Sequence, residues 1–137
     1  MHFSGVEFIY KYTSKQIRLP GDFFLPFGGK LNSNNRWIIL STMIPWEEFE
    51  DEYAKNFKKS KRGEVAYNVR IALGSLIIKE RLGLSDEETV NQISENLYLQ
   101  FFLGFESYTE KAPCQCCDFV WITKQVAKSI DMVDTHI

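Results

Sequence analysis

The sequence lacks the features that place a chain in a membrane or outside the cell. No stretch of its 137 residues approaches the roughly 20 consecutive apolar residues that a helix needs to cross a bilayer. Residues 1–12 lack the basic start and the long apolar centre of a secretion signal. We therefore expect a cytoplasmic protein with no membrane partner.

Cysteine and histidine are also scarce. The three cysteines, Cys114, Cys116 and Cys117, lie within four positions and are odd in number, which argues against a disulfide framework. A structural zinc site needs four ligands, and the two histidines, His2 and His136, stand at opposite ends of the chain. We expect reduced thiols, no metal site and no cofactor.

A surplus of positive charge is missing as well. Sixteen Lys and Arg stand against eighteen Asp and Glu, for a net charge of -2. Such a balance does not suit a protein that holds nucleic acid by bulk positive charge, so any contact with nucleic acid must come from a local patch. At 45% apolar and 15% aromatic residues, the chain has enough material for one compact core.

What the sequence does contain is helical spacing of apolar residues. Residues 1–31 show no period and are predicted to form an irregular N-terminal arm, broken by Pro and Gly. Residues 32–113 are predicted to form a compact helical domain, and 114–137 a divergent C-terminal helix. The predicted helices cover residues 36–44, 46–57, 69–82, 86–95, 97–103 and 119–130. No strand alternation competes with this pattern, so the predicted fold class is all-α with helix-turn-helix-like elements.

Local signals fix the ends of these helices. The polar stretch that ends at Asn35 can begin the first helix, and Gly83 can end the third because glycine adopts the left-handed conformation cheaply. Ser85 with Glu88 fits a capping box for the helix that follows. The third helix, 69–82, carries apolar residues on more than one face and should be buried on at least two sides.

The turn at residues 82–85 resembles a helix-turn-helix, in which the second helix enters the major groove. Here that helix begins with Asp86, Glu87 and Glu88, which would meet DNA phosphates with like charge. A capped turn inside the core is therefore the favoured interpretation.

The best candidate for contact with nucleic acid is the densest positive cluster. Its members are Lys55, Lys58, Lys59, Lys61 and Arg62, and the cluster could be extended by Arg70, Lys79 and Arg81. The alternative is a solvated connection that balances the acidic run at 47–52. Asn35 and Arg36 are weaker candidates, since these residue types contact base edges but also simply begin helices.

Other patterns point to structure more than to chemistry. Aromatic residues such as Trp37, Trp46 and Phe102 could stack on bases, yet their helical spacing places them in the core first. Residues 27–30 lack the preceding strand and the Lys-Ser/Thr ending of a nucleotide-binding loop. No nucleophile triad can be argued. We expect no small-molecule substrate.

An ordered series of motifs across residues 22–113 resembles the N-terminal helical domain of bacterial and archaeal insertion-sequence DDE transposases. The matching segments are Phe27-Gly28-Gly29-Lys30-Leu31-Asn32, Asn35-Arg36-Trp37, Ile44-Pro45-Trp46-Glu47-Glu48, Glu52-Tyr53-Ala54, Ile71-Ala72-Leu73-Gly74, residues 79–96 and residues 98–104. The chain departs from the family pattern at Leu97, where proline is common, and at residues 114–117 and 120–125. In the last stretch only Lys124 is positive, which argues against phosphate contacts there.

The resemblance implies that the chain binds DNA at the terminal inverted repeats of a mobile element. It also implies a downstream catalytic domain that holds two divalent metal ions, for which residues 105–137 leave no room. We therefore expect a truncated, non-catalytic DNA-binding and assembly module, with DNA and a second copy of itself as the candidate partners. The alternative is a helical protein-interaction or dimerisation module without DNA contact, favoured by the sequence pI of about 5.7 and the negative helix at 86–95.

Overall fold

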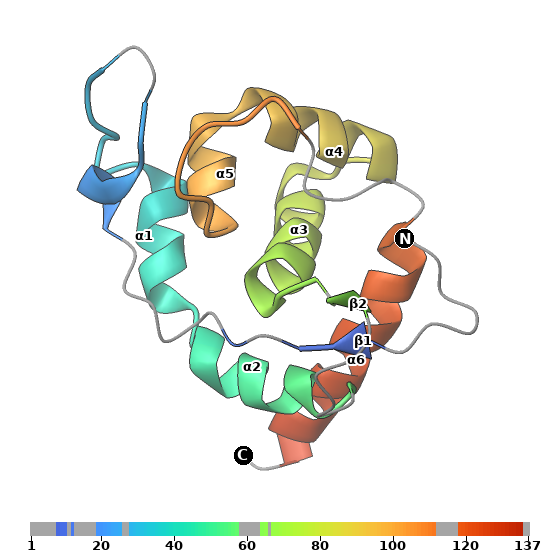
Figure 1. Cartoon of the computed structure of the whole chain (residues 1–137). Helices are drawn as coiled ribbons and strands as arrows, with labels where there is room; N and C mark the ends of the chain where they lie inside the picture. The colour runs from blue at the N-terminus through green and yellow to red at the C-terminus, as the bar shows by residue number, and fades with distance from the viewer. Residues whose placement is uncertain are drawn as a thin grey trace.

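The computed structural model describes residues 8–10, 12, 19–25, 28–57, 64–65, 67–111 and 118–135. The described chain is an all-α domain, as the sequence predicts (Figure 1). Its helices are α1 (Arg36–Met43), α2 (Trp46–Ala54), α3 (Val69–Leu82), α4 (Asp86–Glu95), α5 (Leu97–Phe102) and α6 (Phe119–Thr135), and a 3-10 turn, η1 (Pro20–Asp22), precedes them. Two short strands, β1 (Phe8–Ile9) and β2 (Glu64–Val65), pair in parallel.

The helices begin where the capping residues predict. Asn35 accepts a hydrogen bond from the Trp37 amide at 2.9 Å, and Ser85 Oγ accepts one from the Glu88 amide at 3.1 Å. Gly83, with φ of 63°, ends α3 in the left-handed conformation. Four predicted ends differ. Helices α1 and α5 each stop one residue early, at Met43 and Phe102. Helix α2 stops at Ala54 rather than at 57, because residues 55–57 form turns, and α6 runs on to Thr135 rather than to 130.

Helix α3 lies at the centre of the fold, with α2, α4, α5 and α6 packed around it (Figure 1). Val69, Ala72 and Ile78 have almost no exposed surface. This confirms that the most apolar segment is buried on several sides. Gly74 lets α5 approach closely, since a Cβ at this position would lie 2.6 Å from Leu103 Cδ2.

The aromatic residues line the core around α3. Trp37 and Trp46 both meet the ring of Phe102 edge to face, at centroid distances of 5.3 and 5.6 Å. Tyr53 on α2 is fully buried and stacks edge-on against Tyr10 at 5.4 Å. The interpretation of these rings as core residues is confirmed.

Part of the irregular arm is packed against the helices. Phe23, Leu25 and Leu31 are buried in a second cluster with Ile38 of α1 and Phe101 of α5. Phe24 also forms a bridge with Ser107, in the loop after α5. The segment lacks a helical period, yet it contributes a small core of its own. Among the described residues, no helix is long and apolar enough to span a membrane.

Candidate nucleic-acid interface

The predicted basic cluster is only partly placed by the structure. Lys58, Lys59, Lys61 and Arg62 lie outside the described residues. Lys55 is described and follows the end of α2, where its side chain is 64% exposed and pairs with Glu52 at 3.0 Å. The Glu52 side chain is 12% exposed, so only the lysine end of this pair faces solvent, and from there Lys55 could reach a phosphate.

Arg70 does not belong to this surface, although the sequence made it a candidate extension of the cluster. The residue is 7% exposed. Its Nη2 donates to the carbonyls of Phe101 and Phe102 at 3.2 and 2.9 Å, and its guanidinium lies 5.0 Å from the centre of the Trp46 ring. Arg70 thus satisfies the carbonyl end of α5 inside the core, where DNA cannot reach it.

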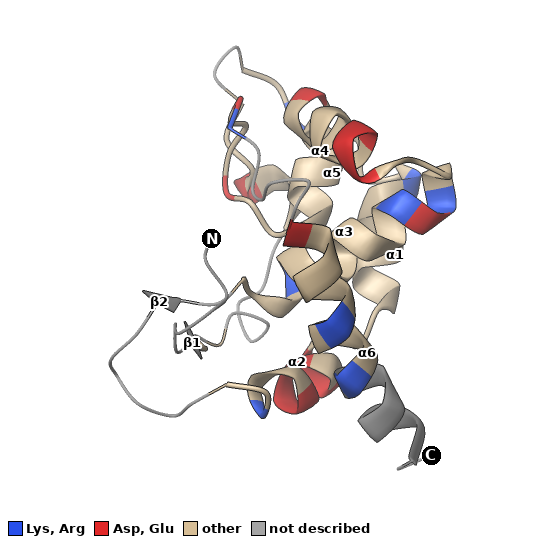
Figure 2. Ribbon diagram, turned by 90° about the vertical axis from the view of Figure 1, so that its right-hand side faces the viewer, with Lys and Arg blue, Asp and Glu red and all other residues tan. Residues whose placement is uncertain are grey.

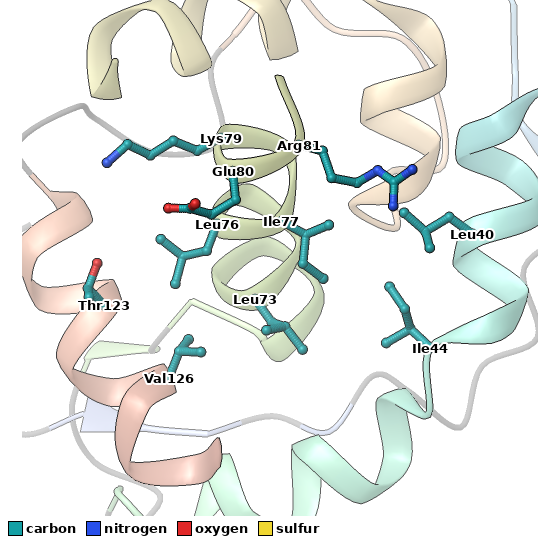
Figure 3. A pocket seen from close by; sticks show the side chains of 10 residues that line it. All are labelled: Leu40, Ile44, Leu73, Leu76, Ile77, Lys79, Glu80, Arg81, Thr123 and Val126. Atoms are coloured by element: carbon teal, nitrogen blue, oxygen red, sulfur yellow. The ribbon is translucent and has the colours of Figure 1, made fainter. Parts of the chain in front are cut away.

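Lys79 and Arg81 lie at the C-terminal end of α3. Lys79 pairs with Asp86 at 2.8 Å, which ties α3 to the start of α4. Arg81 is exposed and stands at one end of an apolar groove with a volume of about 590 Å³ (Figure 3). The groove is lined by Leu40 and Ile44 from the first helix, Leu73, Leu76, Ile77, Lys79, Glu80 and Arg81 from α3, and Thr123 and Val126 from α6.

Asn35 and Arg36 begin α1. The Asn35 side chain caps the helix, because its oxygen accepts a hydrogen bond from the Trp37 amide of the same chain. Arg36 is exposed and holds its guanidinium 5.6 Å from the centre of the Trp37 ring. Of this pair, Arg36 presents charge to solvent.

The structure adds two lysines of α6 to the candidate interface. Lys124 and Lys128 are both exposed on α6 and stand one helical turn apart. Between them, the Gln125 carbonyl accepts a hydrogen bond from the Asn56 side-chain amide at 3.0 Å. The end of α2, from which the basic run continues, is therefore fixed against the stretch of α6 that carries these lysines. The sequence interpretation discounted phosphate contacts at residues 120–125 because Lys124 is the one positive residue of that stretch. Lys128 lies just beyond it and adds a second positive charge one turn along, which the i, i+4 spacing could have indicated.

Acidic and basic side chains are concentrated on different helices, except at the end of α3. Figure 2 shows basic positions along α6, acidic positions on α2 and at the start of α4, and both signs at the end of α3. There the exposed Glu80 lies between Lys79 and Arg81 in the sequence. Glu87 and Glu88 are exposed in the first turn of α4, just after the Ser85 cap. Negative charge at a helix N-terminus is favourable there, whereas it would repel DNA.

Some of the buried polar side chains in the core have hydrogen-bond partners. The Tyr10 hydroxyl accepts from the Val69 amide and donates to the buried Glu50 carboxylate. Burial, together with the hydrogen bond to Glu50, raises the pKa of Tyr10 far above its ordinary value, and burial alone raises that of Tyr53. Gln100 is fully buried. Its side-chain nitrogen donates to the carbonyls of Ile93 and Thr109, and its side-chain oxygen accepts from the Thr109 amide.

The described residues contain no group of three or more His, Cys, Asp or Glu side chains that could hold a metal ion. Cys114, Cys116 and Cys117 lie outside the described residues. The sequence expectation of reduced thiols without a metal therefore stays a prediction.

Comparison with known proteins places the chain in a family. A family model described as Transposase domain (DUF772) matches residues 26–125, well over half of the chain. The chain therefore belongs to this transposase-domain family, and the resemblance seen in its motifs is confirmed.

A curated relative extends the comparison to one bacterium. The chain is 34% identical over 83 residues to "Uncharacterized protein ORF8 in nfe locus" of Rhizobium meliloti. The matched stretch covers 61% of this chain and 39% of that relative, so the chain spans well under two thirds of the relative's length. No solved structure shows a significant match.

Proposed function

We propose that this chain is the DNA-binding and assembly module of a transposase and that it binds the terminal inverted repeats of an insertion sequence. The observation that carries the proposal is membership of the transposase-domain family over residues 26–125. The chain's role is thereby tied to transposition, and contact with element ends is the step that a non-catalytic helical domain can supply.

The proposed DNA surface is formed by α6 and the end of α2. Lys124 and Lys128 are exposed on α6, and the Asn56–Gln125 hydrogen bond fixes the end of α2 beside them. Lys55 stands at this end of α2, and the sequence continues with the basic run at 58–62, so positive charge is concentrated in this part of the sequence although the whole chain is acidic. Ammonium groups spaced along one helix suit phosphate contacts, which position a protein on DNA without reading its sequence.

The test is a gel-shift titration with the cognate terminal repeat at several salt concentrations. Binding should weaken steeply between about 50 and 200 mM salt, because released counterions drive it. Replacing both Lys124 and Lys128 by alanine should weaken binding and flatten the salt slope by about 2, one for each lost phosphate contact.

The matched control replaces two other exposed lysines, Lys30 and Lys111, by alanine, since this removes the same charge elsewhere. The control should bind as the parent protein does. A folded parent protein that gives no salt-sensitive shift at micromolar concentration, or equal losses in both double variants, would contradict the proposal.

A second candidate function is a helical protein-interaction module. The observation that favours it is α1, which is apolar on its outer face as well as on its inner one. Trp37 and Ile38 are buried, yet Ile39 is 46% and Met43 71% exposed. Exposed apolar residues grouped on one face of a helix mark a surface that a protein partner can cover.

A further inference from the structure

The outer face of α1 and the groove beside it form one continuous apolar surface. Ile39 and Met43 stand one turn apart on the outer face, and Leu40 and Ile44, the next residues along, form a wall of the groove. Leu76 and Ile77 of α3 line the groove with them, above the buried Leu73. The helix thus carries both an exposed ridge and half of a groove.

Charge is distributed unevenly along this surface. Arg36, at the start of α1, is the one charged residue of that helix. Arg81 lies near Leu40 at the same end of the groove, while Leu73 lies near Ile44 toward the other end (Figure 3). Lys79 and Glu80 also line the groove, and Lys79 pairs with Asp86. Arg36 and Arg81 therefore leave this end with an excess of positive charge over Glu80.

The other end is negative. Just past Ile44, a hollow of about 610 Å³ is lined by Ile44, Pro45, Trp46 and the carboxylate residues Glu47, Glu48 and Asp51, together with Ser41 and Thr42. These three acids are exposed. Within the part of the chain that the structure describes, none of the three has a cationic partner.

We propose that α1 is a dimerisation helix that packs antiparallel against α1 of a second copy of this chain. A twofold axis across α1 would place the ridge of each copy, Ile39 and Met43, against the other copy's groove. The contact is isologous and closed, because ridge and groove belong to the same patch.

The same axis brings opposite charges together. In an antiparallel pair, Arg36 of one copy approaches the acidic hollow of the other, and Glu47 and Glu48 of that first copy approach the other copy's Arg36 and Arg81. Every such contact occurs twice. A parallel pairing would instead set positive end against positive end, which opposes association. This complementarity is what selects a second copy as the occupant.

The test is a charge-swap experiment followed by light scattering after gel filtration, without DNA. Variant A carries Arg36→Glu and Arg81→Glu, and variant B carries Glu47→Lys and Glu48→Lys. The parent protein should be a dimer, each variant alone should dissociate at least about 10-fold more readily, and an equimolar mixture should form a heterodimer in which all of these contacts are attractive again.

Two controls keep the result specific. Lys30→Glu with Lys111→Glu makes the same change in net charge as variant A at residues that line neither the groove nor the acidic hollow, and should leave the dimer intact. Met43→Asp should dissociate it, with the helical circular dichroism spectrum unchanged because Met43 is exposed. A parent protein that is monomeric at about 200 µM, above the micromolar affinities of ordinary specific complexes, would overturn the proposal, as would a dimer that variant A leaves unchanged.

Dimerisation through α1 goes beyond the proposed DNA contact, and either proposal can fail while the other holds. The DNA experiment changes Lys124 and Lys128 on α6, whereas the dimer experiment changes residues of α1, α2 and the end of α3. A monomer that shifts DNA overturns only the dimer, and a dimer that fails to shift DNA overturns only the DNA contact.

Discussion

The Arg70 guanidinium donates twice to the carbonyl oxygen of Phe102, from Nε at 3.2 Å and from Nη2 at 2.9 Å. The two residues are 32 positions apart, so the bonds join α3 to the end of α5. A planar group with several donors in a fixed fork is well suited to such paired contacts. Gly104, with φ of 86°, leaves space beside this arginine, since a Cβ there would lie 3.2 Å from Arg70 Cδ.

Replacing Arg70 by methionine should destabilise the fold by about 3 kcal/mol. Methionine fills much of the space but leaves the buried carbonyls of Phe101 and Phe102 without these donors. Chemical denaturation measures the change. Lys30→Met on the exposed surface should stay within about 0.5 kcal/mol of the parent, and equal effects at both sites would contradict the role given to Arg70.

Replacing Gly74 by alanine should lower stability by about 1 kcal/mol, although alanine is the better helix former. The new methyl group would meet Leu103 Cδ2 at 2.6 Å, and Leu103 is 1% exposed, so it has little room to move. Gly21→Ala, with nothing within 4 Å, should be close to neutral. In a Leu103→Ala background the same Gly74 change should become stabilising, and a gain in the parent background would show that no clash exists.

Replacing Tyr10 and Tyr53 by phenylalanine should have opposite consequences. The Tyr10 hydroxyl bonds to Glu50 and the Val69 amide, so its loss leaves buried groups without a partner and should cost about 2 kcal/mol. The Tyr53 hydroxyl is buried without a hydrogen bond among the described residues, so its removal should be neutral or stabilising by up to about 1 kcal/mol. Urea titration measures the free energy of unfolding of both variants. A larger loss of stability from Tyr53→Phe than from Tyr10→Phe would contradict these roles.

The fold should lose stability at alkaline pH. Both Tyr10 and Tyr53 have pKa values raised in the folded protein, chiefly by burial, while in the unfolded chain each phenol titrates near about 10. Above that pH the unfolded chain has fewer protons bound, so the free energy of unfolding falls by up to about 1.4 kcal/mol per pH unit for each tyrosine. Below it, this contribution to stability is fully present.

The test compares denaturation of the parent and of Tyr53→Phe between about pH 9 and 11. The free energy of unfolding of the variant should fall less steeply with pH, because one fewer phenol loses its proton on unfolding. Identical slopes in the two proteins would show that Tyr53 does not contribute.

The sequence by itself determined where the helices lie. The caps at Asn35 and Ser85 and the stop at Gly83 act on amides within a few residues, so their partners are present in the local sequence. The central position of α3 also followed from its apolar residues, since a helix that is apolar on several faces must be covered. The family, too, could be recognised from the order of short motifs.

The tertiary structure alone decided which charged residues lie inside and which face solvent. In the sequence, nothing distinguishes Arg70 from the exposed cationic residues. The carbonyls that accept its hydrogen bonds belong to a helix about 30 positions away. Asn56 meets Gln125 across 69 positions, and that contact fixes the turn after α2 against the stretch of α6 that carries Lys124 and Lys128. Burial depends on partners distant in the chain, and no local pattern encodes them. The same reason explains why Phe23, in a segment without a period, packs on Phe101.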